Sequence, residues 1–139
     1  MKDDRIRIIV NEINLGLVKS LNKAINMTNT KYIARMDSDD ISNKNRLEKQ
    51  INFLENNDQY VLVGSRANYI NGKEKYKESQ FYGEVKKDIL IKFCVFFHPS
   101  LLIKTKVLKQ INGYEDYERN EDYALYLKLY YLGYKGYVL

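Results

Sequence analysis

The residues best suited to chemistry are three carboxylates that follow a short, mostly apolar segment. Residues 32–36 (Tyr-Ile-Ala-Arg-Met) predict a buried strand, and Asp37, Asp39 and Asp40 come directly after it. Open α/β sheets bind ligands at the carboxyl ends of their strands. Carboxylates suit hard cations such as Mg²⁺ or Mn²⁺, which complete their coordination with water and substrate phosphates. Asp37 and Asp39 are therefore candidate metal ligands, whereas Asp40 or Ser42 is a candidate cap for the following helix.

A second acidic pair, Glu121 and Asp122, opens a predicted helix far downstream. One interpretation is that the pair offsets the helix dipole, which stabilises a helix by about 0.3–1 kcal/mol. The other is a general base, and only one of two adjacent residues is expected to face a given atom, because they point about 100° apart. His98, the only histidine, precedes Pro99 and has either a structural role or a place in an acceptor site. We expect the two acidic clusters to meet at one site.

Composition predicts one folded domain over residues 1–139. The chain is 45% hydrophobic and 29% charged, which is ordinary for a folded soluble protein. The net charge of +5, from 23 basic and 18 acidic residues, is mild. It indicates a lysine-rich surface or a weak attraction to phosphates and anionic membranes, hence peripheral membrane association as an alternative. No run of like charge indicates a nucleic-acid partner.

The single cysteine, Cys94, lies in the apolar run 93–97, where we expect an inert core residue. One cysteine cannot form an internal disulfide, which fits a reducing compartment. The charged first residues do not resemble a signal peptide, and no stretch approaches the roughly 18 apolar residues of a membrane span. We therefore expect a cytoplasmic protein, with a position at the inner face of the membrane as the alternative.

Apolar periodicity predicts alternating strands and helices along the chain. The pattern predicts helices at 17–25, 44–56, 84–92, 104–111 and 121–132, and strands at 6–10, 32–36, 60–64, 93–97 with 100–103, and 137–139. The strand that contains Pro99 must be broken or lie at an edge, because proline lacks an amide proton. Asn71-Gly72 predicts a hairpin within residues 66–81. The alternation favours a parallel sheet with helical crossovers.

Several short motifs occur together in one order. They are Asn14-Leu15-Gly16-Leu17, Leu21-Asn22-Lys23-Ala24-Ile25, Tyr32 to Asp40, Arg46-Leu47-Glu48-Lys49-Gln50, His98-Pro99-Ser100, Asn112-Gly113-Tyr114 and Glu121-Asp122-Tyr123. In order and spacing they resemble the family 2 glycosyltransferases of the GT-A fold, over nearly the whole chain. The resemblance implies a partial GT-A fold, which is an α/β, Rossmann-like, mostly parallel sheet flanked by helices.

The resemblance also implies an activity. Family members transfer a sugar from a nucleotide-diphosphate sugar to an acceptor hydroxyl, with inversion, in the synthesis of polysaccharides and glycoconjugates. By resemblance, Arg35, Asp37 and Asp39 bind the donor, and Asp37 and Asp39 hold a divalent cation, Mn²⁺ or Mg²⁺, against the diphosphate. Asp122 acts on the acceptor hydroxyl as the base, with Glu121 beside it.

One departure from the family concerns the start of the chain. Family members begin with two further strands, and this chain opens at what would be the third, residues 6–10. We therefore expect a partial domain that lacks the first two strands, in which the strand at 32–36 has lost one neighbour. Each buried unsatisfied backbone group would cost about 1–3 kcal/mol. A non-catalytic remnant is the alternative function, and a homo-oligomer formed through the bare surface is a further expectation.

Overall fold

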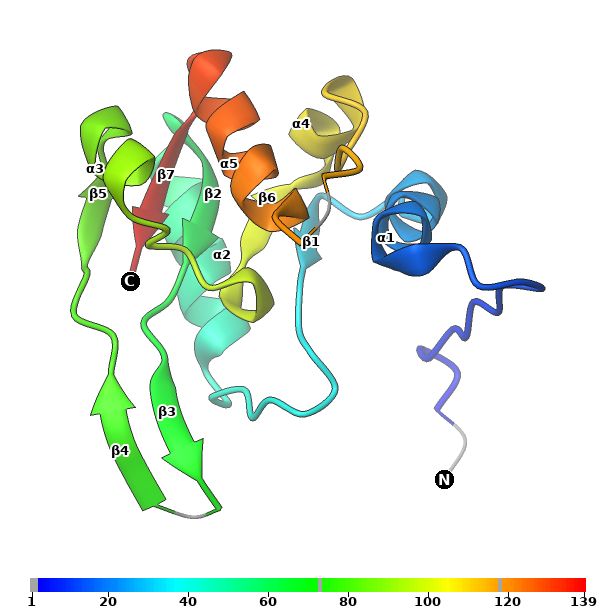
Figure 1. Ribbon diagram of the computed structural model, residues 1–139, viewed down its shortest axis with the longest axis horizontal. Helices are drawn as coiled ribbons and strands as arrows, with labels where there is room; N and C mark the ends of the chain where they lie inside the picture. Colours follow the sequence, from blue (N-terminus) through cyan, green and yellow to red (C-terminus); the bar gives the residue numbers. More distant parts are fainter. Residues whose placement is uncertain (1–2, 73, 118) are drawn as a thin grey trace.

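The computed structural model describes residues 3–72, 74–117 and 119–139, which form a five-stranded sheet flanked by helices and a separate two-stranded hairpin (Figure 1). The strands are β1 (Tyr32–Ala34), β2 (Tyr60–Gly64), β3 (Asn68–Asn71), β4 (Glu74–Glu78), β5 (Gly83–Val85), β6 (Leu102–Lys104) and β7 (Lys135–Val138). The helices are α1 (Gly16–Met27), α2 (Arg46–Asn56), α3 (Lys87–Lys92), α4 (Thr105–Gln110), α5 (Glu121–Tyr131) and the 3₁₀ turn η1 (His98–Ser100). Within the described residues, no helix has the length and apolarity that a membrane crossing requires.

The strands of the main sheet lie in the order β1-β6-β2-β7-β5. β2 and β7 are parallel neighbours, whereas β6 is antiparallel to both β1 and β2, and β5 is antiparallel to β7. Three of the five strands in this sheet (β1, β2 and β7) therefore run in one direction. The predicted α/β class with flanking helices is confirmed, and the insertion of the antiparallel β6 between β1 and β2 is an addition to the prediction.

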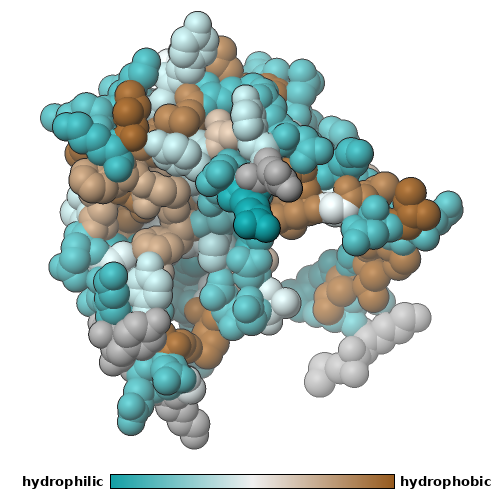
Figure 2. Space-filling model, viewed as in Figure 1, coloured by the Kyte–Doolittle hydropathy of each residue, from teal (hydrophilic) through white to brown (hydrophobic). Residues whose placement is uncertain are grey.

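β1 is an edge strand, because its pairing partner in the described sheet is β6 alone. The prediction that the strand after residue 31 lacks a neighbour on one side is confirmed. The predicted strand at residues 6–10 is wrong. This segment has no regular structure, and Ile6, Ile8 and Val10 are 69%, 82% and 76% exposed. A β-branched sequence forms a strand only where another strand pairs with it, and the segment stands away from the body, with apolar side chains on its surface (Figure 2).

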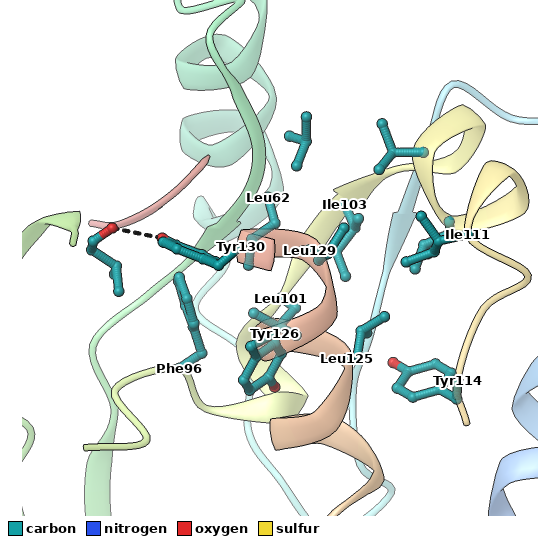
Figure 3. Close-up of a cluster of buried hydrophobic side chains, with 14 of the residues drawn as sticks. Leu62, Phe96, Leu101, Ile103, Ile111, Tyr114, Leu125, Tyr126, Leu129 and Tyr130 are labelled. Atoms are coloured by element: carbon teal, nitrogen blue, oxygen red, sulfur yellow. Dashed lines mark hydrogen bonds between the residues drawn. The ribbon is translucent and has the colours of Figure 1, made fainter. Parts of the chain in front are cut away.

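The core has two layers, one on each face of the sheet. Leu101 and Ile103 pack with α4 and α5 on one face, whereas Leu102, between them, packs with Leu54 of α2 on the other. This is the alternation expected along a strand. The larger layer also contains the aromatic side chains Phe96, Tyr114, Tyr126 and Tyr130 (Figure 3). Tyr130 anchors it to β5 by donating a hydrogen bond of 2.7 Å to the Val85 carbonyl.

The predicted hairpin is confirmed as β3 and β4, and Gly72 in its turn has a φ of +61°. Two other predictions need correction. The predicted helix at 84–92 divides into β5 and α3, because residues 83–85 pair with β7. Residues 93–97 form an irregular segment and not a strand, since the Phe97 carbonyl accepts hydrogen bonds from Ser100 within a turn. Cys94 is consequently exposed and not a core residue.

Candidate functional site

The carboxyl end of β1 carries an ion pair. The Arg35 amide continues the pairing with the β6 side of the sheet by donating to the Leu101 carbonyl at 2.9 Å. Its guanidinium, whose side chain is only 14% exposed, pairs with the Asp37 carboxylate. The backbone then turns, with a bond of 3.4 Å from the Asp40 amide to the Asp37 carbonyl. The pair thus holds the Asp37 side chain at the point where the chain leaves the sheet.

Asp39 and Asp40 are exposed, and both line a pocket of about 910 Å³. Asp37 does not line this pocket. Within the described parts of the chain, no three His, Cys, Asp or Glu side chains are grouped so that they could hold a metal ion. A cation at this loop would thus take few ligands from the protein and the remainder from water and substrate, as Mg²⁺ commonly does.

His98 is the first residue of η1 and is 8% exposed. Its Nε2 is 2.7 Å from the hydroxyl oxygen of Tyr114. Burial lowers the pKa of His98, and the positive charge of Arg35 lowers it further. Burial likewise raises the pKa of Tyr114. Both groups are therefore neutral at physiological pH, and His98 contacts Tyr114 within the protein and is not an open surface group.

The acidic pair lies at the first turn of α5, as predicted, and both side chains are half-buried. The Oδ1 of Asp122 accepts a hydrogen bond of 2.7 Å from the amide of Tyr123. The charges of Asp122, Glu121 and Asp37 all act on His98, where each opposes the lowering of the pKa. The end of β1 and the start of α5 thus both carry charges that act on the buried His98, although Asp39 is not among these charges.

Sequence reasoning missed Tyr126 as a residue of this region. Its side chain is fully buried, and its hydroxyl has no hydrogen-bond partner among the described residues. Burial raises the pKa of Tyr126, and Asp122 and Tyr114 raise it further. The available signal was its position four residues after Asp122, which places both on the same side of a helix.

Two residues of α2 connect the elements of the site, and sequence reasoning assigned no role to either. Arg46 donates to the carbonyls of Pro99 at 2.6 Å and of Arg35 at 3.1 Å, so it ties η1 to the end of β1. Gln50, which is 1% exposed, donates to the Ser100 carbonyl at 2.7 Å. The signal was the motif at residues 46–50, which contains both residues.

The chain is similar to known glycosyltransferases. It is 41% identical over 132 residues to an uncharacterized glycosyltransferase of Methanocaldococcus jannaschii, covering 91% of this chain and 45% of the relative. It is 36% identical over 130 residues to the O-antigen biosynthesis glycosyltransferase WbnJ of Escherichia coli, covering 91% and 50%. It is 30% identical over 128 residues to the amylovoran biosynthesis glycosyltransferase AmsE of Erwinia amylovora, covering 91% and 48%. The chain thus spans about half the length of these relatives.

The family comparison covers most of the described structure. The family described as Glycosyl transferase family 2 matches residues 1–124. The matched region contains the acidic loop after β1, the His98–Tyr114 contact and the first turn of α5. The chain belongs to glycosyl transferase family 2.

Proposed function

We propose that the protein transfers a sugar from a nucleotide-diphosphate sugar to a hydroxyl of a saccharide or glycoconjugate acceptor, with inversion at the anomeric carbon. Family membership supports glycosyl transfer, and two relatives support polysaccharide synthesis, since one is an O-antigen and the other an amylovoran biosynthesis glycosyltransferase. The observation that carries the proposal is that the region matched by the family contains both acidic clusters, one directly after β1 and the other in the first turn of α5.

The carboxylate oxygens of the acidic loop suit a divalent cation. Asp39 is exposed and has carboxylate oxygens to offer, whereas Asp37 is already engaged by Arg35. Asp39 is accordingly the principal proposed ligand, Asp37 contributes from beside Arg35, and the cation is Mn²⁺ or Mg²⁺. When bound, such a cation stabilises the charge that develops on the leaving diphosphate.

Asp122 is the proposed base. Its Oδ1 accepts the Tyr123 amide, which fixes the orientation of the carboxylate. The residue lies in the first turn of α5, and its side chain is half-buried. A carboxylate held in this orientation is able to take the proton from an acceptor hydroxyl as that hydroxyl attacks the anomeric carbon. Direct attack from the face opposite the leaving diphosphate inverts that centre.

Manganese binding in the presence of a nucleoside diphosphate tests the metal assignment. The free Mn²⁺ concentration is measured by electron paramagnetic resonance in the presence of UDP, GDP or dTDP. The unaltered chain is expected to bind Mn²⁺ with at least one of them, and Asp39→Asn to bind it markedly less. Asp58→Asn is the matched control, since the Asp58 side chain is fully exposed in the turn before β2. Equal Mn²⁺ binding by the unaltered chain and Asp39→Asn would remove the metal assignment.

A further inference from the structure

The tripeptide Ile-Asn-Gly occurs twice in the chain, at residues 70–72 and at residues 111–113. An asparagine that precedes a glycine can react with its own backbone, because glycine has no side chain to hinder the approach of its amide nitrogen to the asparagine side chain. The two tripeptides are identical, so the sequence alone predicts similar reactivity for Asn71 and Asn112. A difference between them must come from how the fold surrounds each one.

The reaction in question is the deamidation of asparagine. The amide nitrogen of the glycine loses its proton to solvent and attacks Cγ of the asparagine, so that an N–Cγ bond forms. The Cγ–Nδ2 bond then breaks, and Nδ2 takes up a proton and leaves as ammonia. Water opens the cyclic imide at either of its two carbonyl groups, which gives aspartate or isoaspartate. The reaction needs no co-reactant other than water, and each product carries a negative charge where asparagine has none.

Asn71 and Gly72 lie at the tip of the hairpin, which projects from the body of the molecule (Figure 1). Asn71 is the last residue of β3 and pairs with Glu74, so Gly72 lies in the turn and outside the ladder. Both Asn71 and Gly72 are exposed, and a Cβ atom added to Gly72 would meet no heavy atom within 4 Å. The strand pairing therefore does not require the Gly72 amide, and there is room for an imide ring.

The second pair, Asn112 and Gly113, is held at its glycine. Asn112 is exposed, as Asn71 is, but Gly113 is buried. The Gly113 amide donates a hydrogen bond of 2.8 Å to the Leu108 carbonyl, and a Cβ atom on Gly113 would collide with Oδ1 of Asn22. An imide nitrogen carries no proton, so the product would lose the bond to Leu108. The packing against Asn22 also leaves the Gly113 nitrogen no room to move toward the Asn112 side chain.

We propose that Asn71 is a site of spontaneous deamidation in the folded protein, whereas Asn112 reacts only after the chain unfolds. The product changes the hairpin, because a carboxylate at position 71 faces Glu74 across the ladder, and like charges directly opposite one another are destabilising. Isoaspartate also adds a carbon atom to the backbone, which disturbs the pairing register at the turn. Residues 68–70 of β3 line the same pocket as Asp39, so the modified strand belongs to the surroundings of the candidate site. The modification itself does not depend on the proposed function.

Peptide mass spectrometry of the 139-residue chain, incubated at mildly alkaline pH and then digested in acid, tests the proposal. In the folded chain, the peptide with Asn71 is expected to gain the mass difference between a hydroxyl and an amino group several-fold faster than the peptide with Asn112. In urea concentrations that unfold the chain, the two asparagines should react at similar rates. Similar rates in the folded chain would overturn the proposal. A persistent difference in urea would also overturn it, because the fold would then not be the cause.

A substitution at the glycine tests the mechanism. Gly72→Asn places a side chain beside the attacking nitrogen, and asparagine tolerates the φ of +61° at this position better than most residues do. We expect Gly72→Asn to slow deamidation at Asn71 several-fold. Gly133→Asn is the matched control, because Gly133 also has a positive φ, of +84°, and open space around it. This variant should leave the rate at Asn71 unchanged, and an unchanged rate in Gly72→Asn would exclude attack by the Gly72 nitrogen.

Discussion

Asn22 and Tyr114 are joined by two hydrogen bonds across 92 positions of the sequence. The Nδ2 of Asn22 donates to the Tyr114 carbonyl, and its Oδ1 accepts the Tyr114 amide, each at 2.8 Å. The side chain of α1 thereby satisfies both backbone groups of the residue that contacts His98. Gly113 makes the approach possible, because it has a φ of +65° and a Cβ atom there would collide with the Asn22 amide group. Two of the motifs noted in the sequence therefore meet in space.

The first prediction concerns this pair. Asn22→Ala leaves the amide and carbonyl of Tyr114 without their partners, so we expect a loss of about 1–3 kcal/mol in the free energy of unfolding. Urea denaturation followed by circular dichroism measures it. Asn26→Ala, an exposed position on the same helix, is the control and should change stability by much less. Equal effects of the two substitutions would contradict the structural role of Asn22.

The second prediction concerns the fork of Arg46. Lysine has a single ammonium group and cannot reproduce the planar arrangement that reaches both the Pro99 and the Arg35 carbonyls. We expect Arg46→Lys to lower the free energy of unfolding by about 1–2 kcal/mol. Thermal unfolding measures the change. The control is Arg5→Lys, whose side chain is 90% exposed. An unchanged melting temperature for Arg46→Lys would show that the fork contributes nothing to stability.

The third prediction concerns catalysis. If Asp122 is the base, Asp122→Asn keeps the size of the side chain and removes its ability to take a proton. The rate constant kcat for sugar transfer should fall about 10²- to 10⁴-fold, which is the usual contribution of a general base. Donor binding, measured by calorimetry, should change little. The exposed Asp116→Asn in the preceding loop is the control. A variant Asp122→Asn with normal kcat would exclude Asp122 as the base.

The fourth prediction concerns pH. Burial and the nearby Arg35 lower the pKa of His98 in the folded state from its ordinary value of 6.5. Between the lowered pKa and 6.5, the unfolded chain binds a proton at this residue and the folded chain does not, so acid favours unfolding. The stabilisation from the neutral ring is thus complete above 6.5 and is lost as the pH falls through the folded-state pKa.

Urea denaturation at a series of neutral to acidic pH values tests this dependence. His98→Asn removes the titrating ring, so its stability should fall less steeply with acid than that of the unaltered chain. The difference between the two curves isolates His98 from the carboxyl groups that titrate in both proteins. Parallel curves would show that His98 has the same pKa in the folded and unfolded states.

The fifth prediction concerns close packing at β7. A Cβ atom at Gly136 would lie 2.7 Å from Cζ of Phe96 and 2.9 Å from Cγ of Leu62. Gly136→Ala should therefore destabilise the chain by about 1–3 kcal/mol through overpacking. Phe96→Leu removes the ring that causes part of the collision. The loss of stability in the double variant should be smaller than the sum of the losses in the two single variants. A strictly additive result would contradict the packing argument.

Local patterns predicted the helices that have one buried face and the strand β2, which is buried along its whole length. The apolar spacing of α1 and α2 and the apolar run of β2 are visible in short windows of sequence. Strand order is not visible in this way, since nothing near residues 102–104 indicates that β6 lies between β1 and β2. Residues 83–85 illustrate the same limit, because pairing with β7 overrides a sequence pattern that resembles a helix.

The candidate site was predicted through residue types that carry charge. Asp37, Asp39 and Asp122 were recognisable because neighbouring carboxylates repel one another, so that a cluster of them suggests a function. Tyr126 and Arg46 were not recognisable, since their importance lies in where they are buried and in the distant carbonyls they reach. Such roles depend on tertiary contacts, which a single sequence does not display.

The strand order has a consequence for how the protein forms. Every pair of neighbours in the main sheet joins strands that are not consecutive along the described chain, and β7 at residues 135–138 lies between β2 and β5. During synthesis β1 and β2 therefore have no partner until the ribosome has made β6 at residues 102–104, and β5 has none until it has made residues 135–138. Long loops must close before these strands can pair, which slows folding. Chaperones would be needed during the time in which the strands have no partner.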